Sequence, residues 1–194
     1  MALVKAAKDG DTGEIQLQLG KGADIMVTDE KGMTALMGAA MWGQTATIKL
    51  LLSKGANIEA TNTGGSTALI LAAKKGHTAA VELLLGKGAA VEAMTKWGLT
   101  ALMLAAKKGC IEAIKMLLEA GAGIEAKDED GKTAYDHAPA GIKSQFEARL
   151  TPAAQPAAAN MAAKKSMAAD DDDGSAAAPA KKKAKKEKRE KKLA

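Results

Sequence analysis

The chain has 194 residues, of which 28 are Lys or Arg and 23 are Asp or Glu, giving a formal net charge of +5. Residues 1–150 hold 17 residues of each sign, so the excess of 11 basic over 6 acidic residues belongs to residues 151–194. The single cysteine, Cys110, excludes an intramolecular disulfide and fits a reducing compartment. The sequence shows neither a signal-peptide pattern nor an apolar run of membrane-spanning length, which predicts an intracellular protein, cytoplasmic or nuclear.

Residues 2–28 form the first predicted element, an incomplete copy of a unit that recurs further along the chain. Leu3–Ala7 is expected to end a first helix and Gly10 to turn the chain. A second helix follows, with Ile15 and Leu19 toward the core and Gln18 where the later copies carry leucine. Because the terminal unit of a stack exposes one face to water, the polar Gln18 predicts an N-terminal cap.

Three complete units of 33 residues follow, at residues 29–61, 62–94 and 95–127, and the last two are identical at 17 of 33 positions without a gap. Each unit is predicted to run from a glycine-containing turn to a first helix, a glycine and a second helix with an i, i+3, i+4 apolar face. The predicted N-caps of the first helices are Thr34, Thr67 and Thr100. Since one unit cannot bury its apolar face alone, this period predicts a stacked repeat fold.

The recurring pattern Gly-x-Thr-Ala-Leu-x-x-Ala-Ala-x-x-Gly, followed by an aliphatic pair and Gly-Ala, resembles the ankyrin repeat. The resemblance covers about residues 2–150 and implies an all-α solenoid of stacked helix-turn-helix units with short hairpin-like turns. The family often has Thr-Pro-Leu-His, whereas this chain has Thr-Ala-Leu followed by Met37, Ile70 or Met103. Alanine is an acceptable first helical residue. Apolar packing has to replace the histidine hydrogen bond, worth about 1 kcal/mol per site.

Residues 128–150 are predicted to close the stack as a C-terminal cap. A decayed fourth copy begins at Gly131, and Pro139 cuts its first helix short. Ile142, Phe146 and Leu150 are spaced by four residues and predict one apolar stripe on a last helix. Residues 151–194 are rich in alanine, proline, aspartate and lysine. We predict a disordered tail there, because such a segment cannot bury enough apolar surface to offset the entropy of ordering.

The sequence contains no recognisable catalytic constellation, and we expect neither enzyme activity nor a cofactor or metal site. Two histidines and one cysteine fall short of the three or four clustered ligands that zinc needs. His77 resembles the family's structural residue after the turn glycine, and Cys110 takes the same place in the next unit. Structural roles are therefore favoured over a base or a redox role. Asp170–Asp173 lack the alternation and the closing glutamate of a calcium loop.

The resemblance also implies a binding surface, since the family grips other proteins with a concave face lined by turn tips and exposed first-helix ends. Both tryptophans fall on this surface: Trp42 stands where other units have lysine, and Trp97 where they have lysine or glycine. Tryptophan is enriched in binding hot spots, and the alternative is that the rings fold onto a neighbouring unit. The lysine pairs favour either an acidic partner or plain solvation. The predicted partner-binding residues are Met33, Met41, Trp42, Lys74, Lys75, Lys96, Trp97, Leu99, Lys107 and Lys108.

The tail carries a basic cluster that resembles a short nuclear-import signal and consists of Lys181, Lys182, Lys183, Lys185 and Lys186. Two alternatives remain open for it. One is a solvated polybasic segment, and the other is electrostatic contact with nucleic acid or an anionic surface. No aromatic side chain is interleaved with these lysines, so base stacking has no platform.

Together these features predict a monomeric, non-catalytic protein-binding module that acts as a scaffold, an adaptor or a steric inhibitor of a protein partner. The alternative is a nuclear or nucleic-acid-associated protein, in which the basic tail binds and the repeats recruit a partner. The two functions differ in their dependence on salt and on the tail.

Overall fold

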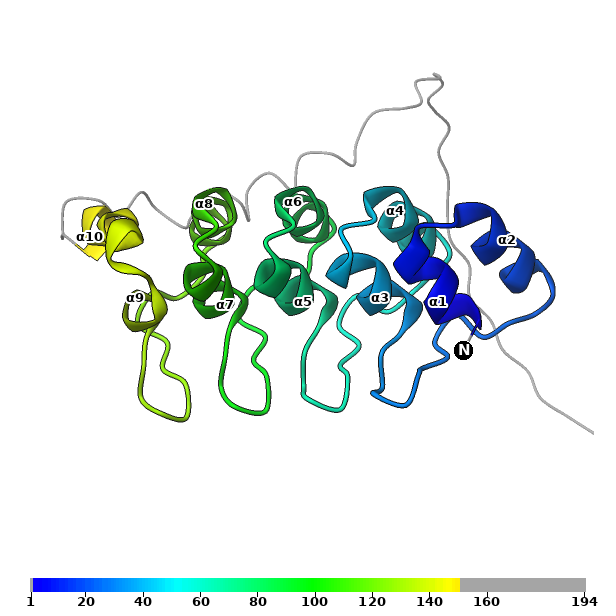
Figure 1. The fold of residues 1–194 in the computed structure, drawn as a ribbon, viewed down its shortest axis with the longest axis horizontal. Coiled ribbons are helices and arrows are strands. Elements are labelled where there is room, and N and C mark those ends of the chain that lie inside the picture. The colour runs from blue at the N-terminus through cyan, green and yellow to red at the C-terminus, as the bar shows by residue number, and fades with distance from the viewer. Residues whose placement is uncertain (1, 151–194) are drawn as a thin grey trace, which may run out of the picture. The chain divides into compact units, whose positions relative to one another are not determined.

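The structure, a computed structural model, describes residues 2–150, with side chains up to residue 147 (Figure 1). The predicted disordered tail at residues 151–194, with the lysines of the predicted import signal, lies outside the described residues. Within residues 2–150 the only β-type pairings are two isolated bridges, Thr28 with Thr34 and Met94 with Thr100. The helices are α1 (Ala2–Asp9), α2 (Thr12–Gly20), α3 (Ala35–Met41), α4 (Thr45–Ser53), α5 (Ala68–Lys75), α6 (Thr78–Gly86), α7 (Ala101–Lys108), α8 (Ile111–Glu119), α9 (Ala134–His137), the 3-10 helix η1 (Ala140–Ile142) and α10 (Ser144–Leu150).

The helices lie in two rows, with the first helix of each unit in one row and the second helix in the other (Figure 1). In the first row α1 packs on α3, α3 on α5, α5 on α7, and α7 on α9. In the second row α2 packs on α4, α4 on α6, and α6 on α8. Each helix from α1 to α7 in the first row also packs on the second helix of its own unit. This arrangement confirms the predicted all-α stack of helix-turn-helix units.

The core runs through the stack from unit to unit. The first helices are buried on nearly every side, as in α5, where residues 68–73 are all buried. Their many alanines allow close packing, because small side chains let helix axes approach each other. The second helices bury one face only, as the fully buried Leu51, Leu84 and Leu117 show at equivalent places in α4, α6 and α8. Each unit therefore depends on its neighbours to cover its apolar residues.

Threonine caps begin the first helices, as the sequence predicts. In α3, α5 and α7 the threonine hydroxyl accepts a hydrogen bond from the backbone N–H three residues further on, at 3.3 to 3.4 Å. The short α9 has a reciprocal cap: Asp136 Oδ2 also accepts from the backbone N–H of Thr133 at 2.8 Å. These bonds satisfy N–H groups that have no partner inside the helix.

Four hairpin loops project from the row of first helices (Figure 1). They consist of residues 28–34, 61–67, 94–100 and 127–133. One polar side chain organises each loop by accepting hydrogen bonds from the backbone N–H groups two and four residues further on. These side chains are Asp29, Asn62, Thr95 and Asp128. Each later loop donates one backbone N–H to the loop before it, for example Lys96 N–H to the Gly64 carbonyl at 3.0 Å. The loops thus form a ladder that holds neighbouring units in register.

The C-terminal cap differs from the predicted single stripe. The helix α9 ends at His137, just before Pro139, as predicted. Ile142, however, belongs to η1, whereas Phe146 belongs to the separate α10, so these residues do not share one helix. The Phe146 ring is fully buried and meets the Tyr135 ring edge-on, with centroids 6.4 Å apart. The cap is closed by this aromatic pair.

Asp128 ties the last hairpin loop to α9. Its Oδ1 atom accepts from the N–H groups of Lys132 (2.8 Å) and Asp130 (3.0 Å), and its Oδ2 atom lies 2.7 Å from Nε2 of His137. The hydrogen bond from Lys132 is the main cause that lowers the pKa of the Asp128 carboxyl. Partial burial opposes it, and the contact with His137 adds to it. The folded chain therefore favours the ionised carboxylate.

This lowered pKa predicts a loss of stability in acid. An unfolded aspartate has a pKa of about 3.9. Above that pH the carboxyl is ionised in both states, and its stabilisation of the folded state is fully present. As the pH falls through this value toward the lower folded pKa, the unfolded state binds the proton first and the contribution is lost. We expect Asp128→Asn to lower the urea midpoint at pH 5, and the gap from wild type to narrow toward pH 3.

The matched control for this pH series is Glu129→Gln, which removes an exposed neighbouring carboxylate. Its midpoint is expected to follow wild type at every pH. A gap between wild type and Asp128→Asn that stays constant from pH 5 to pH 3 would show that the fold does not hold this carboxylate ionised.

Candidate protein-binding surface

Six of the predicted binding residues gather at the C-terminal ends of three neighbouring first helices. Met41 is the last residue of α3, Lys74 and Lys75 end α5, and Lys107 and Lys108 end α7. Trp42 follows directly as the C-cap of α3. Because α3 packs on α5 and α5 on α7, these ends lie side by side. We call Met41, Trp42, Lys74, Lys75, Lys107 and Lys108 the helix-end strip.

The lysines of the helix-end strip are exposed and carry charge of one sign. Lys108 leans across the end of α5, since its Cγ lies 3.4 Å from the position of a Cβ placed on Gly76. Within residues 2–150 the ion pairs are Lys8–Asp29, Lys132–Asp130 and the His137–Asp128 contact. No lysine of the strip takes part in these pairs.

Trp42 lies at the N-terminal end of the row of lysines. Its equivalents in the next two units are Lys75 and Lys108. The side chain is 59% exposed, although tryptophan is a residue that proteins usually bury to a large extent. Beneath it, Met41 is half-buried, and the Met41 carbonyl lies 3.1 Å from Nε2 of His77 in the next unit. Trp42 therefore offers an open aromatic face on a fixed backbone.

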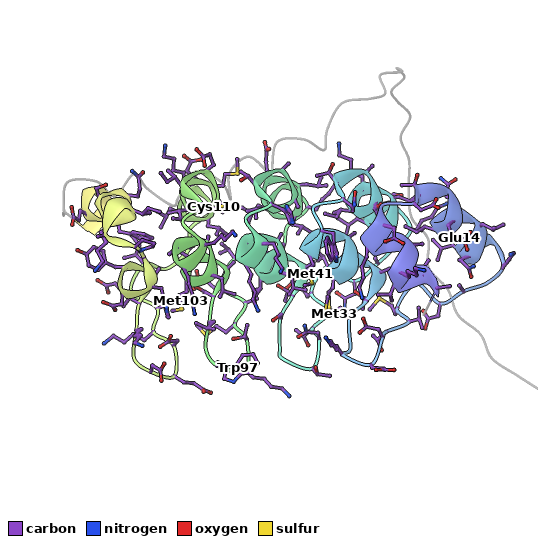
Figure 2. The ribbon with its side chains drawn as sticks, viewed as in Figure 1. Glu14, Met33, Met41, Trp97, Met103 and Cys110 are labelled. Carbon is purple, nitrogen blue, oxygen red and sulfur yellow. The ribbon has the colours of Figure 1, made fainter. Side chains whose placement is uncertain are left out.

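Trp97 lies on a different part of the unit, at the tip of the third hairpin loop (Figure 2). The side chain is 55% exposed. The edge of its ring touches the second loop, since Cζ3 lies 3.3 Å from the position of a Cβ placed on Gly64. Trp97 therefore combines both alternatives from the sequence: part of the ring packs on a neighbouring unit and part faces solvent. Its neighbour Lys96 is exposed, and Leu99 is half-buried.

Met33 does not belong to the surface, and this part of the prediction is wrong. Only 5% of the residue is exposed, because its side chain turns inward from the first loop to pack with Val4, Met37 and Leu71. Its sulfur also accepts a hydrogen bond from Nδ2 of Asn62 at 3.3 Å. Met33 therefore joins the first two hairpin loops to the core.

Three residues that follow the glycine after a first helix connect neighbouring units. Gln44 Nε2 donates to the Lys8 carbonyl at 3.3 Å, and His77 Nε2 lies 3.1 Å from the Met41 carbonyl. Cys110 Sγ lies 3.7 Å from the Gly76 carbonyl, at the junction of α7 and α8 (Figure 2). Each side chain reaches back to the unit before it. The structural roles predicted for His77 and Cys110 fit this geometry.

A groove of about 500 Å³ lies between α1 and the first hairpin loop, and no sequence pattern predicts it. Inside it Lys8 Nζ lies 3.0 Å from Asp29 Oδ2. Desolvation raises the pKa of Asp29, but hydrogen bonds from the Met33 N–H and from Lys8 outweigh it, so the pKa is lowered. The pair is 21 residues apart, a spacing unrelated to the 33-residue period. The groove differs from the helix-end strip in that its charged residues carry both signs.

Another exposed apolar residue was missed. Met94, just before the third loop's Thr95, is 47% exposed, whereas the equivalent residues of the first two loops are the threonines Thr28 and Thr61. The departure from threonine was visible in the sequence. Met94 adds apolar surface to the loop that carries Trp97.

No group of three or more His, Cys, Asp or Glu side chains in the described part of the chain is arranged to hold a metal ion. Among the same residues, none of the helices has the length and apolar character needed to cross a membrane.

Two family models match this chain. The model described as Ankyrin repeats (3 copies) matches residues 3–95, and the model described as Ankyrin repeats (many copies) matches residues 86–138. The chain belongs to the ankyrin-repeat family, whose repeats are generally protein–protein interaction modules and typically non-catalytic. A search of curated proteins finds no match to it.

Proposed function

We propose that this ankyrin-repeat protein is a non-catalytic binding module that holds a protein partner on the face formed by the first-helix ends and the hairpin loops. It would act as a scaffold, an adaptor or a steric inhibitor. The helix-end strip is the main contact, and the loop residues Lys96, Trp97 and Leu99 extend it. The observation that carries the proposal is the exposed Trp42, which stands in a row where the neighbouring units have lysine.

The energetic argument starts from the exposed tryptophans. Burying a large apolar side chain fully would stabilise the fold by roughly 1.5–3 kcal/mol, so two tryptophans that stay more than half exposed favour a role outside the fold. Tryptophan also contributes disproportionately to binding when a partner desolvates it. The lysines at the ends of α5 and α7 supply polar surface next to Trp42, and interfaces commonly have a polar rim beside an apolar anchor.

The test is affinity capture from cell lysate with the full chain and a Trp42→Ala, Trp97→Ala double variant. The control is Leu17→Ala, which removes an equally exposed apolar side chain from α2, away from the proposed face. We expect a captured protein to bind the double variant at least tenfold more weakly, and the control within twofold of wild type. All three proteins should unfold at similar temperatures.

The competing function, in which the basic tail binds, is tested in the same experiment by a full chain with Lys181, Lys182, Lys183 and Lys185 changed to glutamine. If this variant loses every specific partner while the double tryptophan variant keeps them, the tail carries the activity and the proposed face is not the binding site.

A further inference from the structure

We infer that the helix-end strip binds an extended acidic segment of the partner, with one apolar side chain of that segment seated against Trp42. This inference rests on the proposed function and adds the chemistry of the ligand. It follows from three features of the strip: charge of a single sign, the regular spacing of the lysines, and the position of the one aromatic residue at the end of the row.

The charge distribution is the first argument. Along the strip Lys74, Lys75, Lys107 and Lys108 are exposed with no carboxylate paired to them within residues 2–150. The exposed faces of the outer helices instead mix both signs, with Lys49, Glu82, Glu112, Lys115 and Glu119. A row of like charges is complementary to a partner of opposite charge and repels one of the same charge.

Helix stability alone does not account for this row. A lysine in the last turn of a helix interacts favourably with the helix dipole, by about 0.3–1 kcal/mol, and this effect explains lysines at the ends of α5 and α7. The helix α3 nevertheless ends with Met41 and Trp42, and its last turn has no basic residue. An exposed tryptophan at this place has no such benefit, so the combination of Trp42 with the lysines points to a ligand.

The spacing defines the ligand further. Packed helices lie roughly 8–10 Å apart, and an extended chain advances about 3.3 Å per residue, so one step between units corresponds to about three residues. A segment that places an apolar residue at Trp42 therefore reaches Lys74 and Lys75 with its third following residue and Lys107 and Lys108 with its sixth. The expected ligand has an apolar residue followed by acidic residues at positions +3 and +6.

A protein segment fits the strip better than a nucleic acid does. Residues 1–150 carry as many acidic as basic residues, so a long polyanion has no net attraction to this part of the chain. The hairpin loops on either side of the third loop's Lys96 bring the carboxylates Glu30, Glu129 and Asp130 to their tips. A long polyanion that extends from the strip to the loops would approach these carboxylates, whereas a short acidic segment confined to the strip would not.

The test uses fluorescence titration of the full chain carrying Trp97→Phe, which leaves Trp42 as its only tryptophan. The probe is a tryptophan-free peptide of eleven residues with leucine at one position and glutamate at +3 and +6. Two control peptides carry glutamine in place of glutamate, or the same glutamates moved next to the leucine. We expect a shift in Trp42 emission with the probe, binding at least tenfold weaker for the glutamine peptide, and several-fold weaker binding at 200 mM than at 50 mM salt.

The decisive variant changes Lys74, Lys75, Lys107 and Lys108 to glutamine. Its charge-matched control changes four lysines outside the strip, on the α4, α6 and α8 side: Lys49, Lys54, Lys87 and Lys115. A second charge-matched control changes Lys181, Lys182, Lys183 and Lys185 in the tail. We expect at least a tenfold loss of peptide binding in the first variant and less than a twofold change in both controls. A variant with arginine at the four strip positions should retain binding, and circular dichroism checks that each protein is folded.

Three results would overturn the inference. Equal loss in the strip variant and in either charge-matched control would mean that net charge, rather than the strip, binds the peptide. An oligonucleotide that binds the strip more tightly than the peptide and displaces it would identify nucleic acid as the ligand. If a captured protein needs Trp42 but binds the strip variant as tightly as wild type, the proposed function stands and the acidic ligand is wrong.

Discussion

Replacing Gly65 with alanine is expected to lower the free energy of unfolding by about 2–4 kcal/mol. Gly65 has a left-handed backbone with φ of 76° in the second hairpin loop, a conformation that costs other residues about 1–2 kcal/mol. A Cβ at this place would also stand 2.8 Å from the backbone nitrogen of Lys96. Backbone atoms cannot rotate away, so the two loops must separate. This separation lengthens the hydrogen bond that the Lys96 N–H donates to the Gly64 carbonyl. Urea unfolding followed by circular dichroism measures the loss.

The matched control is Gly131→Ala in the fourth loop. Gly131 holds the equivalent position with φ of 74°, but apart from its own chain neighbours no described residue has an atom within 4 Å of its added Cβ. This variant should lose only the conformational part, about 1–2 kcal/mol. Equal losses in the two variants would show that close packing of neighbouring loops adds nothing to the stability of the stack.

The 33-residue period was enough to predict the repeating features of the fold. The threonine caps, the helix-ending glycines and the buried faces recur in each of the three complete units, because each of these units packs between two similar neighbours. The family resemblance added the hairpin loops. The last helix of the C-terminal cap was not predicted correctly, because this segment does not repeat the 33-residue unit. Ile142 and Phe146 fit a helical spacing, but the chain after Pro139 forms η1 and then begins α10.

The candidate surface was only partly predictable, because the period identifies equivalent positions but not which way a loop side chain points. Met33 and Leu99 hold equivalent positions and were both predicted to bind a partner, yet Leu99 is half-buried at the loop whereas Met33 turns into the core. The contact of Trp97 with Gly64 joins the same position of two successive loops. It depends on how loops stack, and no pattern within one unit reports it. The exposure of Trp42 was predictable, since its place directly after the last residue of α3 determines the direction of its side chain.

Truncating a core residue in the middle of the stack is expected to be the most damaging single change. Leu84→Ala removes a fully buried side chain from α6, which packs between α4 and α8. Large-to-small changes of this kind cost about 2–5 kcal/mol, a large part of the 5–15 kcal/mol typical of a whole domain. Since α6 supports neighbours on both sides, the loss should lower the urea midpoint of the entire described stack. Leu17→Ala, at a half-exposed position in α2, serves as the control and should change it little.

Phe146→Ala tests whether the damage from truncating a buried side chain depends on where the residue lies in the stack. Phe146 is also fully buried, and its truncation removes about 3–5 kcal/mol of packing. Among residues 2–150, however, the cap has a neighbouring unit on its inner side only. In a stack stabilised by nearest-neighbour contacts the damage should stay local. Hydrogen exchange is expected to accelerate in residues 134–147 and to stay slow in α3 to α6. Accelerated exchange throughout the described stack would instead mean that the units unfold as one. With local fraying, Trp42 and the lysines that end α5 would keep their support, so this variant should still bind the acidic peptide.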